Sequence, residues 1–125
     1  MTGDALRNTQ MRIDAKSKDN GAVLSLSGKV IGDSVPQLKQ NIEERINSGV
    51  NWLIIDLAEV PLMDSSALGT IIAAFLKLRE RNGKLVLLNA RKNIRDVLAI
   101  TKLDSLFELY DDMQMALESI GMEGL

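Results

Sequence analysis

The sequence predicts an α/β fold, a single domain whose mixed β-sheet of about five strands carries about four helices in the order ββαβαβαβα. Three observations lead to this prediction. Short apolar runs of β-prone residues alternate with longer segments whose apolar residues recur at helical spacing. The length of 125 residues suits one domain with one core. Apolar residues make up 46% of the chain and its net charge is only −2, which is typical of a globular protein.

The chain begins with a predicted β-hairpin. Residues 1–10 have no periodic pattern, so we expect a flexible lead-in there and a domain that spans residues 11–121. Apolar and polar residues alternate at Met11–Ala15 and again at Ala22–Ser27, with turn-forming residues between them at Lys18–Gly21. Two antiparallel strands joined by a tight turn are the simplest interpretation.

A helix and a central strand are predicted next. Asp33 or Ser34 is expected to cap a helix that has Pro36 in its first turn and ends near Ser48–Gly49. The apolar stripe of this helix consists of Val35, Leu38, Ile42 and Ile46. Beyond it, Trp52–Leu57 is a nearly continuous run of apolar, β-prone residues, which is typical of a strand covered on both faces.

The second half of the chain repeats the alternation of helix and strand. Asp64–Ser66 can cap a helix that runs from Ser66 to Arg81 and stops at Asn82–Gly83. A right-handed crossover through this helix predicts that Lys84–Leu88 lies parallel to the strand Trp52–Leu57 and next to it. The remaining elements are expected to be a helix around Ile94–Ile100, a short strand near Leu106–Leu109 and a last helix around Met113–Ile120.

The composition excludes several classes of function. The chain has no cysteine and no histidine, which removes thiolate nucleophiles, zinc–thiolate sites and Ser-His-Asp triads. Gly28 and Gly32 lack the lysine and hydroxyl of a phosphate-binding loop. We therefore expect no cofactor, no metal and no enzymatic activity. Few aromatic residues and a net negative charge argue against a nucleic-acid partner. No apolar stretch is long enough for membrane insertion, so a cytoplasmic protein is expected.

The segment Asp56–Gly69 is the most informative, because it runs from the centre of the predicted sheet into a helix. A serine near a helix start usually does no more than accept a hydrogen bond from a free backbone N–H. Here Asp64 can already cap the helix, so Ser65 and Ser66 supply more hydroxyls than capping needs. This surplus favours a further role for the serines.

The helical period separates two faces of the long helix. The expected core face consists of Leu68, Ile71, Ile72, Phe75 and Leu78, and the outer stripe of Ser66, Gly69, Thr70, Ala73 and Lys77. Exposed helix faces ordinarily favour Glu, Lys and Arg, so the small residues Gly69 and Ala73 predict that another protein approaches this stripe closely. An ordinary solvent-facing surface is the alternative.

These residues resemble the signature of the STAS domain in bacterial anti-anti-sigma factors, where a buried strand ends in D-L and D-S-S-G-L-G opens the next helix. The matching positions are Asp56, Asp64, Ser65, Ser66, Leu68 and Gly69. The predicted order of elements also fits that domain over nearly the whole chain. Two positions depart from the family pattern: Ala67 stands in place of a glycine, and Ile31 in place of a frequent aspartate, with Asp33 two residues later.

The resemblance implies a regulator that works by partner switching. Unphosphorylated, it would bind an anti-sigma factor that is also a serine kinase and so free a sigma factor for transcription. Phosphorylated on Ser66, with Ser65 as second choice, it would be released, and a metal-dependent serine/threonine phosphatase would reset it. The expected partner-binding residues are Asp64, Ser65, Ser66, Gly69, Thr70, Ala73 and Asp33.

Two other functions stay open from the sequence. The chain could be a STAS accessory or scaffold subunit of a larger assembly, such as a transporter-associated module, in which Ser66 is never phosphorylated. It could also be a weak nucleotide-binding or hydrolytic protein, which the missing phosphate loop and the missing histidine disfavour.

Overall fold

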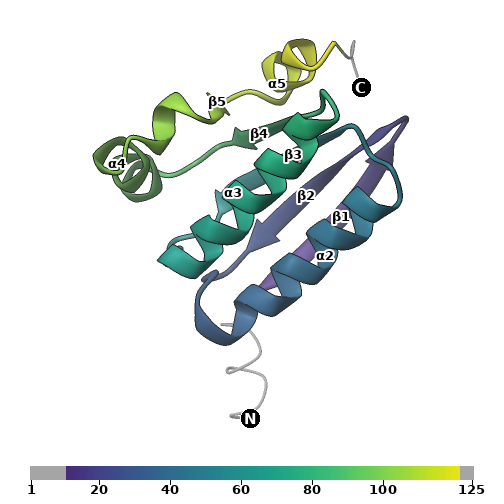
Figure 1. Ribbon diagram of the computed structural model, residues 1–125. Helices are drawn as coiled ribbons and strands as arrows, with labels where there is room; N and C mark the ends of the chain where they lie inside the picture. Colours follow the sequence, from purple (N-terminus) through teal and green to yellow (C-terminus); the bar gives the residue numbers. More distant parts are fainter. Residues whose placement is uncertain (1–10, 122–125) are drawn as a thin grey trace.

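The computed structural model describes residues 11–121, so the lead-in expected at residues 1–10 lies outside the described residues. Within them, five strands form one mixed sheet in the order β1-β2-β3-β4-β5 (Figure 1). The strands are β1 (Arg12–Lys18), β2 (Gly21–Ser27), β3 (Trp52–Glu59), β4 (Lys84–Leu88) and β5 (Glu108–Tyr110). β1 pairs antiparallel with β2, and every other pair is parallel. The predicted α/β class and the predicted β3–β4 neighbourhood are confirmed.

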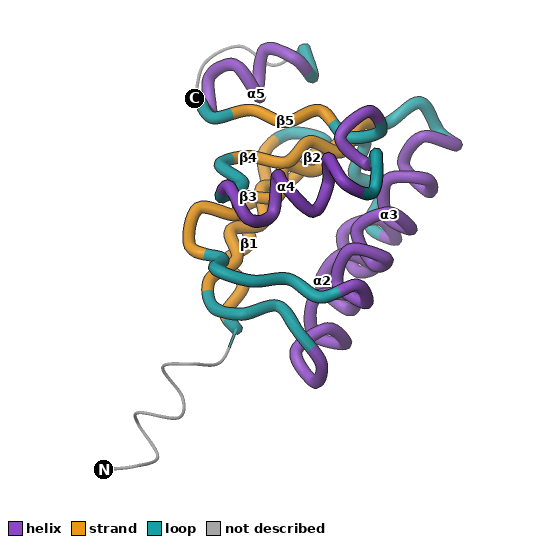
Figure 2. Tube along the Cα trace, turned by 90° about the vertical axis from the view of Figure 1, so that its left-hand side faces the viewer, coloured by secondary structure: helices purple, strands orange, loops and turns teal. Residues whose placement is uncertain are grey.

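The helices cover both faces of the sheet. They are α2 (Val35–Asn47), α3 (Ser65–Glu80), α4 (Lys92–Ile100) and α5 (Met113–Ser119). α2 and α3 lie side by side on one face, and α5 lies against the other (Figure 1), an arrangement that Figure 2 shows along the edge of the sheet. None of the helices in residues 11–121 is long and apolar enough to cross a membrane.

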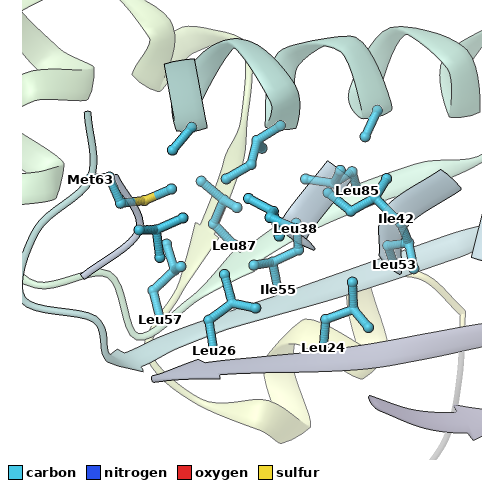
Figure 3. Packing of buried hydrophobic residues seen from close by; sticks show 14 of the residues in the cluster. Leu24, Leu26, Leu38, Ile42, Leu53, Ile55, Leu57, Met63, Leu85 and Leu87 are labelled. Carbon is cyan, nitrogen blue, oxygen red and sulfur yellow. The ribbon is translucent and has the colours of Figure 1, made fainter. Parts of the chain in front are cut away.

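Successive side chains of the central strands point to opposite faces of the sheet and pack into two separate cores. Leu53 and Ile55 of β3 point towards α2 and α3, while Trp52 and Ile54 point towards α5. The larger core lies between the sheet and α2 and α3 (Figure 3). Its fully buried side chains include Leu24, Leu26, Leu38, Leu53, Ile55, Leu57, Ile71, Leu78, Leu85 and Leu87. β3 is therefore buried on both faces, as its continuous apolar run predicts.

The start of α2 differs from the prediction. Neither Asp33 nor Ser34 caps the helix with its side chain, because a 3-10 turn, η1 (Gly32–Ser34), precedes α2. The Ser34 hydroxyl instead accepts a hydrogen bond from the Ile31 N–H at 2.9 Å and donates to the Ile31 carbonyl at 2.7 Å. Ser34 thus stabilises the turn rather than the helix.

The strand predicted near Leu106–Leu109 begins two residues later and ends one residue later, at β5. A second 3-10 turn, η2 (Leu103–Ser105), delays it, since the N–H groups of Leu106 and Phe107 both donate to the Leu103 carbonyl. The Phe107 side chain is buried, and its ring meets Phe75 edge to face at 5.4 Å.

The two faces of α3 agree with the predicted period, with one correction. Leu68, Ile71 and Leu78 are buried as expected, but Ile72 and Phe75 are only half-buried. Small residues that the prediction left out of the core, Ala67 and Ala74, are buried instead. The buried face of α3 is therefore centred nearer to these alanines than the prediction placed it. Because alanine side chains are small, α3 can lie close to the sheet.

Candidate functional site

The site lies where two loops meet at the start of α3. Backbone hydrogen bonds join the loop after β2 to the loop after β3: the Val30 N–H donates to the Leu62 carbonyl at 3.0 Å, and the Asp64 N–H donates to the Val30 carbonyl at 3.3 Å. Val30 and Met63 also form an isolated parallel bridge. Residues 30–34 and 62–66, far apart in the sequence, are thereby placed side by side.

Asp64 is the centre of the polar contacts at this point. As the N-cap of α3, its Oδ1 accepts hydrogen bonds from the Ala67 N–H at 2.9 Å and from the Ser66 hydroxyl at 2.7 Å. Its Oδ2 accepts from the Gly32 N–H at 2.9 Å. The bond from Gly32, followed by those from Ser66 and Ala67, holds the pKa of the Asp64 carboxyl below its ordinary value. Asp64 is therefore a carboxylate at neutral pH.

Ser66 is exposed at the second position of α3, with its hydroxyl proton directed at Asp64. Its oxygen accepts no hydrogen bond from residues 11–121, so its lone pairs are open to an incoming group. Ser65 is exposed too, but its hydroxyl has no partner in the same part of the chain. The predicted surplus of hydroxyls over capping is confirmed, since Asp64 alone caps the helix and Ser66 donates to the cap.

Asp33 lies close to this cluster without joining it. It is exposed in η1, next to Gly32, whose N–H donates to Asp64. Within the described residues its carboxylate makes no hydrogen bond to Ser66 or to Asp64. The turn that carries Asp33 is thus held at the start of α3 by a neighbouring backbone group.

A groove of about 370 Å³ runs between α2 and α3 and reaches Ser66. One wall consists of the outer stripe of α3 together with the buried Ala74, and the other wall belongs to α2, with Lys39, Ile42, Glu43 and Ile46. Lys77 and Glu43 form an ion pair across it at 3.7 Å. A Cβ atom added to Gly69 would meet nothing within 4 Å, so packing inside this chain does not require a glycine there.

Sequence reasoning missed the α2 wall of this groove. The spacing of Lys39 and Glu43, one turn apart, places them on one side of α2, but which helix they face depends on contacts distant in sequence. It also missed a smaller apolar groove of about 130 Å³ between α3 and α4, lined by Leu62, Met63, Leu68, Asn93, Ile94 and Val97.

Residues 11–121 contain no cluster of three or more acidic side chains that could hold a metal ion.

Comparisons with known proteins point to one family. The sequence profile of the STAS domain matches residues 12–116. The chain is 31% identical over 99 residues to an anti-sigma-B factor antagonist of Listeria monocytogenes, covering 78% of this chain and 86% of that protein. It superposes with a TM-score of 0.81, at 26% identity, on the crystal structure of an anti-sigma factor antagonist from Mycobacterium paratuberculosis, covering 90% of this chain and 96% of that one.

The fold is also similar to that of the anti-sigma factor antagonist SpoIIAA in two forms. The TM-score is 0.77 to its unphosphorylated form, covering 90% of this chain and 100% of that one. It is 0.72 to the phosphorylated form from Bacillus, covering 87% of this chain and 99% of that one. Both are 20% identical to this chain, so they show a shared fold.

Proposed function

The chain belongs to the STAS domain family and is related to anti-sigma factor antagonists, and we propose that it binds an anti-sigma factor when Ser66 is unmodified and is released when Ser66 is phosphorylated. The observation that carries the proposal is the Ser66 hydroxyl, exposed at the start of α3, held by Asp64 and next to the α2–α3 groove. The partner is an anti-sigma factor that is also a serine kinase.

The proposed modification transfers a phosphoryl group from ATP to the Ser66 oxygen. An O–P bond forms at Oγ while the bond from the γ-phosphorus to the β–γ bridging oxygen of ATP breaks. The hydroxyl proton passes to water, and ADP leaves. Ser66 suits this step better than Ser65, because Asp64 orients its hydroxyl while its lone pairs stay open. Ser65 remains the second choice.

Release needs no refolding of the protein. A phosphate adds about −1.5 to −2 charges, which the N-terminal end of a 16-residue helix tolerates because its N–H groups and dipole favour an anion. A partner docked on Gly69, Thr70 and Ala73 would meet the bulk and charge of the phosphate directly. SpoIIAA, a protein of the same fold, has structures in unphosphorylated and phosphorylated forms, which supports a modification that leaves the fold intact.

The docking surface consists of the N-terminal half of α3 and the turn before α2. Gly69 supports this assignment, because neither backbone conformation nor internal packing requires a glycine in the middle of α3. A close approach by another protein would explain why this position is a glycine. Asp64, Ser65 and Asp33 complete the surface at the helix start. A serine/threonine phosphatase would restore the binding form, and the protein would act in the cytoplasm by binding rather than by catalysis.

The proposal is tested by titrating the partner kinase with wild type, Ser66→Ala and Ser66→Asp. We expect Ser66→Ala to bind like wild type and to resist release by ATP, and Ser66→Asp to bind more weakly because it brings a negative charge to the same place. Ser65→Ala is the matched control and should still be phosphorylated. Tight binding by Ser66→Asp, together with no phosphate on Ser66 in the intact mass of protein from its own cells, would contradict the proposal and favour an accessory subunit.

A further inference from the structure

The two oxygens of the Asp64 carboxylate connect separate parts of the molecule. Oδ1 is bound to the start of α3 through Ser66 and Ala67, and Oδ2 is bound to the Gly32 N–H of η1. A change at Ser66 therefore acts on the same side chain that holds the turn before α2. This makes Asp64 a physical link between the modified residue and a loop 32 residues earlier in the chain.

The attachment of η1 to the start of α3 depends on a side chain, whereas the attachment of Val30 nearby does not. Val30 is fixed by backbone bonds to Leu62 and Asp64, which do not involve a side chain. The Gly32 N–H, in contrast, has the Asp64 carboxylate as its acceptor. Gly32 is exposed, has a φ of +49°, and would find nothing within 4 Å of an added Cβ atom. Inside the turn, the Gly32 carbonyl accepts from the Val35 N–H and the Ser34 hydroxyl bonds to the Ile31 backbone, so the bond to Asp64 serves to tie the turn to the start of α3.

We propose that Asp64 relays the phosphorylation of Ser66 to η1, so that a phosphate on Ser66 releases the Gly32 N–H and frees the turn that carries Asp33. The modified oxygen can no longer donate to Asp64, which loses the bond that is 2.7 Å long in the unmodified protein. A phosphate on that oxygen places negative charge next to a carboxylate, and like charges at this range repel. Phosphate oxygens also compete for the free N–H groups at the start of α3.

The carboxylate then leaves the position in which Oδ2 meets Gly32. The backbone bonds of Val30 remain, so the change is confined to η1. Phosphorylation would in this way alter the partner surface at two places, at Ser66 itself and at Asp33. The relay rests on the proposed function only in taking Ser66 as the residue that is modified.

The test places phosphoserine at position 66 during synthesis and follows the backbone amides by NMR hydrogen exchange. We expect the Gly32 amide to exchange about tenfold faster in the phosphoserine protein than in the unmodified protein, as loss of one charge-assisted hydrogen bond implies. The Val30 amide, bound to Leu62, is the internal reference and should not change. Ser66→Ala should leave Gly32 protected, because it removes the hydroxyl without adding charge.

Asp64→Asn isolates the link. Asparagine caps a helix about as well as aspartate, but its amide nitrogen cannot accept the Gly32 N–H when its oxygen faces Ala67. Gly32 should therefore exchange faster in this variant as well. Asp112→Asn at the N-cap of α5 is the matched control, since Asp112 accepts from the Met115 N–H through Oδ1 alone within the described residues, and it should leave Gly32 unchanged.

Two results would overturn the relay. One is a Gly32 amide that keeps its protection in the phosphoserine protein; the other is equal loss of protection at Val30, which would mean that the whole site opens. If Asp64→Asn fails to fold, the comparison of phosphoserine with Ser66→Ala decides alone. Because the phosphate is installed without a kinase, this test of the relay is independent of whether a kinase modifies Ser66 in cells. A negative result here would overturn the relay and leave the proposed function standing. The absence of phosphate on Ser66 in cells would overturn the proposed function instead.

Discussion

Asp64 has three tasks at the start of α3, and each depends on its charge. It caps the helix through the Ala67 N–H, orients the Ser66 hydroxyl, and holds the turn before α2 through the Gly32 N–H. All three donors stabilise the ionised form, which is why the pKa of this carboxyl lies below its ordinary value. A single protonation would weaken all three contacts together.

The first prediction concerns the pH dependence that follows. A carboxyl whose pKa is lowered by folding stabilises the folded state above its ordinary pKa of 3.8 and loses this effect as pH falls through the lower, folded value. Asp64→Ala should therefore lower the melting temperature by a constant amount from about pH 7 to about pH 5. As pH falls from the ordinary pKa to below the lower, folded pKa, the difference between the two melting temperatures should shrink to its smallest value.

Thermal unfolding at a series of pH values measures this. Asp33→Ala removes an exposed carboxylate from the adjacent turn and is the matched control. If the melting temperatures of wild type and Asp64→Ala stay equally far apart into strong acid, the effect of Asp64 does not come from its charge.

Gly69 gives the second prediction, because its effects on stability and on binding have opposite signs. A Cβ atom at Gly69 meets nothing within 4 Å, so Gly69→Ala should raise the free energy of unfolding by about 0.5–1 kcal/mol through helix propensity. The same methyl group should weaken binding of the partner about tenfold, since it fills the space into which the partner's backbone fits.

Denaturant unfolding and a binding titration together test Gly69. Gly83→Ala is the contrasting variant: its Cβ atom would lie 2.5 Å from the Asn51 carbonyl oxygen, so it should destabilise the protein. Unchanged affinity of a stabilised Gly69→Ala would show that the partner does not approach α3 at this point.

At the scale of the elements, the sequence predicts which face of α3 points outward, but it does not predict that α2 lies beside that face. Period alone identifies Ser66, Gly69 and Ala73 as outward-facing, because a helix fixes the direction of each side chain relative to the next. It cannot identify Lys39 and Glu43 as the facing wall, because that depends on how α2 and α3 pack across the sheet. The hydrogen bond from Gly32 to Asp64 is likewise a tertiary contact without a local sequence signal.

The third prediction tests the outer stripe without changing Ser66. Ala73 is exposed on α3 and lines the groove, so Ala73→Glu should alter stability by only a few tenths of a kcal/mol. Affinity for the partner should fall tenfold or more, because the glutamate brings bulk and an unpaired charge into the interface. Ala99→Glu on the exposed side of α4 is the matched control and should bind normally. A large loss of stability in Ala73→Glu would contradict its exposed position.

For the whole molecule, the sheet separates the α2–α3 face, where we propose that the partner docks, from the face covered by α5. The continuous apolar run of β3 predicts burial on both sides, and the structure confirms this with two cores. The sequence does not indicate how unequal they are: the core under α2 and α3 is extensive, while the other is formed by a few strand residues with Ala116 and Leu117 of α5. The position of β5 could not be predicted either, because η2 depends on Lys102 adopting a left-handed conformation with φ of 63°.

The last prediction compares a residue in the larger core with a residue in the smaller core on the opposite face of the sheet. Leu38 is fully buried beneath α2 in the larger core, so Leu38→Ala should cost about 2–5 kcal/mol of global stability.

Leu117 belongs to the seven-residue α5, which the smaller core holds against the opposite face. Leu117→Ala should therefore speed hydrogen exchange at α5 through local opening while the amides of α2 keep their protection. If the partner docks on the α2–α3 face, Leu117→Ala should bind it within about twofold of wild type, a difference of less than 0.5 kcal/mol. A tenfold loss of affinity in a variant whose α2 and α3 amides remain protected would place part of the interface on α5, and the groove could then no longer be the whole docking surface.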